Sequence, residues 1–143
     1  MTRRAGFTLI ETLLVVVVIS LCGLIAMPKF RDAVATNNVA SARAKIMALY
    51  STARANSAGS GRVTWLHLDG NNAYVTAVLA GGALDTITPI ESMSGQYGVN
   101  VVTTQDSVMI NQSGIGRTAA TIRILKGIRA DTIQISSYGR VMK

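Results

Sequence analysis

The chain has 143 residues, a length that allows one small globular domain beyond an N-terminal anchor. Fourteen Lys and Arg against seven Asp and Glu give a formal net charge of +7, so an anionic partner has to be considered. The single cysteine, Cys22, has no partner within the chain, which excludes an intramolecular disulfide.

The chain begins with a short basic leader, residues 1–6 (MTRRAG), and a long apolar segment, residues 7–27. As a helix, these roughly 21 residues would span about 31 Å, close to the thickness of the hydrocarbon layer of a bilayer. Glu11 lies inside the apolar segment, where an ionised carboxylate costs several kcal/mol unless it is paired. The residues therefore predict a membrane-spanning helix in which Glu11 needs a partner. A secretory signal peptide and a plain single-pass anchor are the alternatives, but the segment is too long for a signal-peptide core and no small-x-small cleavage site follows it.

The residues around Gly6 carry a resemblance to a known family. The sequence GFTLIE, from Gly6 to Glu11, resembles the class III signal of type IV pilins and type II secretion pseudopilins, and Pro28 stands where pilins commonly carry a helix-bending proline. The resemblance implies that a membrane-embedded prepilin peptidase cuts between Gly6 and Phe7 and methylates the new N-terminal amine of Phe7. It also implies that Glu11 pairs with the Phe7 amine of a neighbouring subunit, which joins two charges that are each costly alone in lipid.

The charges that flank the apolar segment, together with the cytoplasmic active site that the resemblance implies for the peptidase, predict a cytoplasmic N-terminus and a periplasmic head. We expect a single-pass protein of the inner membrane before assembly and a pilus or pseudopilus subunit afterwards, in contact with other pilin or pseudopilin subunits. The expected organisation is a leader at 1–6, a transmembrane and filament-core helix at 7–28, an amphipathic continuation at 29–56 and a β-rich globular head at 57–143.

Beyond Pro28, apolar residues recur at spacings of mostly three and four, which predicts that the helix continues as an amphipathic helix. Proline lacks a backbone donor and crowds the carbonyl four residues before it, so a bend or local melting is expected at residues 23–28. The polar sequence NSAGSG at residues 56–61 predicts the end of a helix about 50 residues long.

The rest of the chain has the pattern of short strands. Residues 62–68 and 73–79 are rich in β-branched and aromatic residues, and the sequence DGNN between them predicts a hairpin. Residues 80–98 predict a loop with a short strand near 86–90. Further strands are expected at 99–103, 108–111, 120–126, 132–136 and 140–142. The predicted fold class is α+β, with the long N-terminal helix packed on a small antiparallel sheet.

The C-terminal third is similar to the GspH/FimT group of minor pseudopilins, through the sequences INQSG at 110–114, TIRI at 121–124 and IQISSYGRV at 133–141. Its last residues, Gly139 to Lys143, resemble the Gly-Arg-x-Arg motif by which FimT-type minor pilins are thought to hold DNA, although Lys143 replaces the second arginine and stands one residue further along. This resemblance implies double-stranded DNA as a partner. The candidate DNA-binding residues are Arg117, Arg123, Lys126, Arg129, Arg140 and Lys143.

No catalytic or metal-binding pattern is present in the sequence. His67 is the only histidine, and its place in a predicted strand indicates a surface or half-buried sheet residue. The acidic residues of the head lack metal-site spacing, and the glycines form no phosphate-binding motif. We therefore expect a structural subunit with no catalytic residues, no metal and no cofactor. The alternative is a minor pilin that binds DNA for uptake through its basic C-terminal residues, without reading the base sequence.

Overall fold

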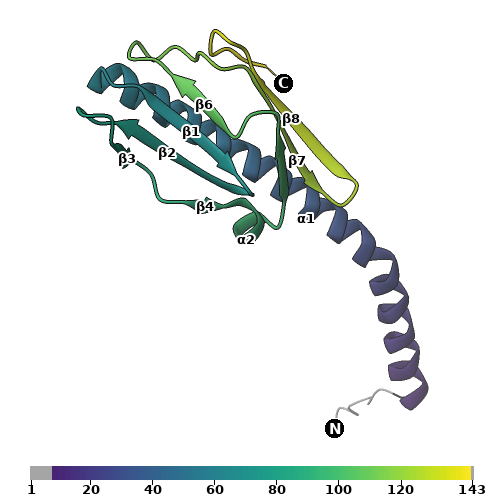
Figure 1. The fold of residues 1–143 in the computed structure, drawn as a ribbon. Coiled ribbons are helices and arrows are strands. Elements are labelled where there is room, and N and C mark those ends of the chain that lie inside the picture. Colours follow the sequence, from purple (N-terminus) through teal and green to yellow (C-terminus); the bar gives the residue numbers. More distant parts are fainter. Residues whose placement is uncertain (1–7, 143) are drawn as a thin grey trace. The chain divides into compact units, whose positions relative to one another are not determined.

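The protein is described here from a computed structural model, in which residues 8–142 are described. By its internal contacts the chain divides into two compact units, Met1–Val34 and Ala35–Lys143. We call residues 8–34 the anchor and residues 35–142 the head. Helix α1 (Leu9–Ser60) contributes to both units, and every other helix and strand belongs to the head (Figure 1).

Helix α1 is unbroken over 52 residues. The local melting expected at residues 23–28 is not observed, because Pro28 removes only one donor from the backbone ladder while its neighbours keep their hydrogen bonds. The helix also ends later than the predicted Asn56. Ser57 is buried, and its hydroxyl donates to the carbonyl of Arg62 (2.8 Å) and contacts that of Asn111, so the last turn is held by the head. Gly61, with φ of 62°, then ends the helix.

The head contains two antiparallel sheets. The first has the strand order β3-β2-β1-β6, with β4 also paired to β2, and the second has the order β5-β7-β8-β9. The strands of the first sheet are β1 (Thr64–Asp69), β2 (Asn72–Val78), β3 (Leu84–Thr86), β4 (Glu91–Ser92) and β6 (Ser107–Ile110). Those of the second are β5 (Asn100–Thr103), β7 (Ala120–Lys126), β8 (Arg129–Ile135) and β9 (Val141–Met142). The predicted α+β class, with a long helix on small antiparallel sheets, is confirmed.

The predicted hairpin at residues 62–79 is confirmed as β1 and β2. Their two-residue connection, Gly70 and Asn71, has positive φ at both positions (51° and 72°), as the tightest hairpin turns require. The prediction of a strand near 86–90 is wrong for most of that range, because β3 ends at Thr86 and β4 begins at Glu91.

The short helix α2 (Met93–Tyr97) was not expected from the sequence. Its Met93 is buried, the Ser92 hydroxyl accepts a hydrogen bond from the Gly95 amide, and Gly98 ends the helix with φ of 59°. Burial of Met93 in the core stabilises a helix here, although the glycine- and serine-rich sequence favours a loop.

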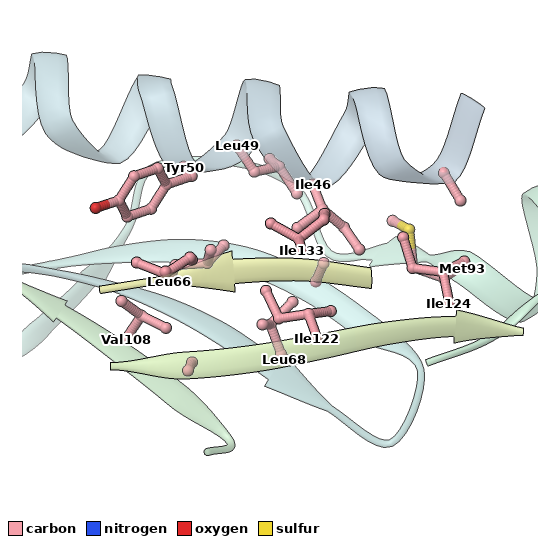
Figure 2. Packing of buried hydrophobic residues seen from close by; sticks show 14 of the residues in the cluster. Ile46, Leu49, Tyr50, Leu66, Leu68, Met93, Val108, Ile122, Ile124 and Ile133 are labelled. Atoms are coloured by element: carbon pink, nitrogen blue, oxygen red, sulfur yellow. The ribbon is translucent and has the colours of Figure 1, made fainter. Parts of the chain in front are cut away.

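The second half of α1 packs against both sheets (Figure 2). Its buried residues Ile46 and Leu49 contribute to one core with Leu66 and Val108 of the first sheet and Ile122 of the second. Ion pairs also link the helix to each sheet: Lys45 contacts Glu91 at 2.9 Å and Arg43 contacts Asp131 at 3.1 Å. The hydrogen bond between Lys45 and Glu91 raises the pKa of the lysine and lowers that of the carboxyl.

Substitutions of two neighbouring residues of α1 test this packing. Ile46 is 1% exposed and Met47 is 38% exposed. We expect Ile46→Ala to lower the free energy of unfolding by about 2–5 kcal/mol, because it leaves a cavity in the core. Met47→Ala should cost less than about 1 kcal/mol. Denaturant unfolding followed by fluorescence of Trp65, the only tryptophan, measures both, and equal losses would contradict the packing described here.

Candidate functional site

The anchor presents an apolar surface with one carboxylate in its first helical turn. Every residue from 8 to 34 is exposed, and among the described residues α1 is the one helix that is long and apolar enough to cross a membrane by length and composition. The Glu11 amide donates to the carbonyl (3.1 Å) and the hydroxyl (3.3 Å) of Thr8, so Thr8 caps the helix, which begins at Leu9, two residues before Glu11. The predicted cleavage residues Gly6 and Phe7 lie outside the described residues.

A close backbone contact determines where Arg140 and Arg117 lie. Gly116 and Gly139 approach each other so closely that a Cβ built on Gly139 would lie 2.6 Å from the Gly116 nitrogen. Tyr50 of α1 closes this contact, since its buried hydroxyl donates to the Gly139 carbonyl at 3.1 Å. Burial raises the pKa of Tyr50, so the hydroxyl keeps the proton that it donates.

Three arginines adjoin this contact, two as the next residues in the chain and one through a hydrogen bond, and we call Arg54, Arg117 and Arg140 the basic patch. Arg117 and Arg140 each follow one of the two glycines directly, and both are exposed. Arg54 donates from its Nε to the Gly114 carbonyl at 2.9 Å, and its guanidinium carbon lies 6.0 Å from the centre of the Tyr50 ring. The tertiary fold thus brings together two predicted residues and one that sequence reasoning missed.

The other predicted basic residues lie elsewhere in the head. Arg123 is exposed on β7, in register with Thr132. Lys126 and Arg129 face each other across the β7–β8 hairpin, and the Lys126 ammonium donates to the Tyr97 carbonyl at 2.8 Å. Lys126 lies six residue steps along β7 from Ala120 at the other end of the strand, a distance of about 20 Å. Lys126 and Arg129 therefore lie at one end of the second sheet, Arg117 and Arg140 lie near the other end, and Arg123 lies between them. Lys143 lies outside the described residues.

Tyr50 and Arg54 differ in whether the sequence could have indicated them. Tyr50 follows Ile46 by four residues, so it continues the apolar stripe of the helix. The spacing of apolar residues in the sequence could therefore have predicted that Tyr50 is buried. Arg54 had no such signal, because its acceptor, Gly114, is 60 residues away in the chain.

His67 is a half-buried sheet residue, as expected. Its Nε2 lies 2.9 Å from the Thr76 hydroxyl, and its ring stacks on Tyr74 with 4.7 Å between the ring centres. Burial lowers the pKa of His67. Within residues 8–142 no three His, Cys, Asp or Glu side chains are placed to hold a metal ion.

Comparison with known proteins gives one family and several related folds. Residues 1–27 match the family described as the prokaryotic N-terminal methylation motif. Comparison with curated protein sequences gives no significant match.

Among solved structures, the chain is similar to the type IV minor pilin FimU of Pseudomonas aeruginosa, with 17% identity, a TM-score of 0.59, and coverage of 74% of this chain and 87% of FimU. It is also similar to the minor pseudopilin EpsH of the type II secretion system of Vibrio cholerae, with 15% identity, a TM-score of 0.59, and coverage of 75% and 93%. At these identities the likeness shows the fold. The methylation motif at the N-terminus and the minor-pilin fold of the described chain together support the type IV pilin and pseudopilin class for this protein.

Proposed function

We propose that this chain is a minor pilin or pseudopilin subunit, cleaved after Gly6 and assembled through α1 into, or at the tip of, a type IV pilus or a type II secretion pseudopilus. The observation that carries the proposal is the anchor: a helical segment with no buried residue and an apolar surface, which begins in a methylation motif. Such a surface requires a covering of lipid or of other helices. Lipid covers it before assembly and neighbouring subunits cover it afterwards.

Glu11 favours the assembled state of α1 over its state in lipid. In lipid its carboxylate is unpaired, and the N-terminal amine that cleavage creates on Phe7 is a second costly charge. In the assembly the amine of one subunit lies against Glu11 of its neighbour, and the attraction between them is strong because the surroundings are apolar. Prepilin peptidase and other pilin or pseudopilin subunits are thus the partners, and the head lies in the periplasm until assembly.

Processing is tested by mass spectrometry of the protein from cells. We expect the mature chain to begin at Phe7 with a methylated amine. Gly6→Val should retain residues 1–6, because a branched side chain blocks the approach of the peptidase to the backbone, whereas Ala5→Ser should be processed normally. A wild-type chain that still carries its first six residues would overturn the proposal.

A second candidate function, capture of double-stranded DNA, is favoured by the basic patch. Arg117 and Arg140 are exposed, and neither guanidinium forms an ion pair with another residue between 8 and 142. A fixed backbone contact holds the two residues, so the backbone needs no further ordering before the guanidinium groups contact phosphates, and only the rotamer freedom of the two side chains is lost. On this view the head binds the DNA backbone without sequence preference.

Titration of the head with double-stranded DNA at several salt concentrations tests this function. Three phosphate contacts predict a slope of about −2.7 in a plot of log affinity against log salt, since each contact contributes about −0.9. Arg140→Ala should weaken binding to unrelated sequences equally, and Arg123→Ala, which removes an exposed arginine outside the basic patch, should have a smaller effect. Absence of binding at low salt leaves the assembly function as the function of the chain.

A further inference from the structure

An exposed aromatic ring lies beside the contact between Gly116 and Gly139. Tyr138 directly precedes Gly139 in the turn that joins β8 to β9, and it is 84% exposed. Three hydrogen bonds fix the backbone of this turn. The Gly139 amide donates to the Ser136 carbonyl (2.9 Å), the Ser136 amide to the Arg140 carbonyl (2.9 Å), and the Arg140 amide to the Ser136 hydroxyl (3.0 Å). The Tyr138 ring is thus held on a fixed backbone, and only its two side-chain torsions remain free.

The same contact places Tyr138 close to the two exposed arginines of the basic patch. A Cβ built on Gly116 would lie 2.7 Å from the Gly139 Cα. Neighbouring Cα atoms are about 3.8 Å apart, so the Cα atoms of Arg117, Tyr138 and Arg140 lie within about 12 Å of one another. From such positions the long side chains of tyrosine and arginine can contact one nucleotide or two adjacent nucleotides.

The charges around Tyr138 fit an anionic chain. The two segments that meet here, residues 111–118 and 136–142, contain no acidic residue. Within residues 8–142, Arg117 and Arg140 form no ion pair, and the acid nearest to Arg140 along the chain, Asp131, is paired with Arg43 at 3.1 Å. The phosphates of a nucleic acid would therefore meet two unpaired guanidinium groups and no acid of these segments.

The exposed ring distinguishes between the forms of DNA that this surface could take. A single exposed tyrosine is ordinary on a protein surface, and arginines alone are enough to contact phosphates. The combination is informative, because sites for single-stranded nucleic acid join basic groups to an aromatic ring on which a base stacks. The bases inside a duplex stack on one another and offer Tyr138 no free face, whereas an unpaired base offers one. The composition of the surface therefore favours a strand with unpaired bases.

We propose that the basic patch binds single-stranded DNA, with the Tyr138 ring stacked on an unpaired base and the guanidinium groups of Arg117 and Arg140 on the flanking phosphates. The proposal rests on the DNA capture proposed above as the second function, and it names the form of DNA that this surface takes. Every base has a face on which a ring can stack, so the site binds without sequence preference.

The full-length protein in neutral detergent micelles tests the proposal, with binding measured by the fluorescence anisotropy of labelled oligonucleotides. One strand carries thymine at every position, and a second strand of equal length keeps every phosphate but lacks the bases. We expect the strand with bases to bind about 5- to 150-fold more tightly, which corresponds to about 1–3 kcal/mol for one stacked base. The abasic strand binds through its phosphates only.

Variants of the turn identify the groups that make the contact. Tyr138→Ala should weaken binding to the thymine strand and leave binding to the abasic strand unchanged. Because it removes no charge, it should also leave the salt dependence unchanged, whereas Arg140→Ala should weaken binding to both strands and reduce the slope of log affinity against log salt by about 0.7. Tyr138→Phe keeps the ring and Ser137→Ala changes an exposed neighbour in the same turn, so both should bind like the wild type. Denaturant unfolding followed by Trp65 fluorescence identifies any variant that has not folded.

The outcomes separate stacking from attraction between charges. A preference for the strand with bases that requires Tyr138 supports the proposal. Equal binding of the two strands by the wild type, or a preference that Tyr138→Ala leaves intact, overturns stacking and leaves DNA capture by the arginines in place. Absence of binding to either strand at low salt overturns DNA capture, and the stacking proposal with it.

Discussion

Gly139→Ala is expected to lower the free energy of unfolding by more than about 3 kcal/mol. Gly139 has φ of 77°, a conformation that costs an L-residue about 1–2 kcal/mol. The added Cβ would also lie 2.6 Å from the Gly116 nitrogen and 2.9 Å from the Tyr50 hydroxyl, where backbone and a buried ring leave little room to shift. Denaturant unfolding followed by Trp65 fluorescence measures the loss.

Gly127→Ala is the matched control for this substitution. Gly127 has a similar φ of 58°, but nothing lies within 4 Å of the position that a Cβ would take. We therefore expect only the conformational cost of about 1–2 kcal/mol. Tyr50→Phe should cost about 1–3 kcal/mol, since it leaves the buried Gly139 carbonyl without its donor. Equal losses for the two glycines would show that the contact between Gly116 and Gly139 does not constrain the head.

Glu11→Gln is expected to leave cleavage after Gly6 intact and to reduce incorporation into the filament by about two to four orders of magnitude. The substitution removes the carboxylate that pairs with the Phe7 amine and leaves that amine uncompensated among apolar helices. Removing one partner of a buried ion pair costs about 3–5 kcal/mol, and each 1.4 kcal/mol is a factor of ten in an equilibrium. The measurement is the ratio of sheared-filament protein to membrane protein, with the mature N-terminus determined in both fractions.

Thr12→Val provides the control for Glu11. Thr12 is the next residue of the same helical turn, and its hydroxyl donates to the Leu9 carbonyl at 2.8 Å, so the substitution removes a polar group without changing charge. It should be incorporated like the wild type. If Glu11→Gln is also incorporated normally, Glu11 has no pairing role in assembly, and the apolar surface of the anchor alone drives it.

Residue patterns in the sequence were sufficient to predict the features that depend on local chemistry. A continuous apolar segment with one acid predicted the anchor, and a three-to-four spacing of apolar residues predicted its continuation to the head. The sequence DGNN predicted the β1–β2 hairpin, because only a few residue types tolerate the two positive φ values of that turn. Each of these signals is contained in a few adjacent residues or in a simple period.

Tertiary structure decided what depends on residues far apart in the chain. Ser57 extends α1 because its partners, Arg62 and Asn111, hold the last turn, and α2 forms because Met93 is buried. The described basic residues of the predicted site do not lie together, because the strand pairing places Lys126 and Arg129 at one end of the second sheet and Arg140 at the other. Arg54 joined Arg117 and Arg140 through Gly114, 60 residues away. The residue pattern by itself determined the long apolar N-terminal helix and the α+β class, since these follow from hydrophobic period and turn chemistry. Only the tertiary structure decided which arginines share a surface, because that depends on strand order and on two glycines that meet across the fold.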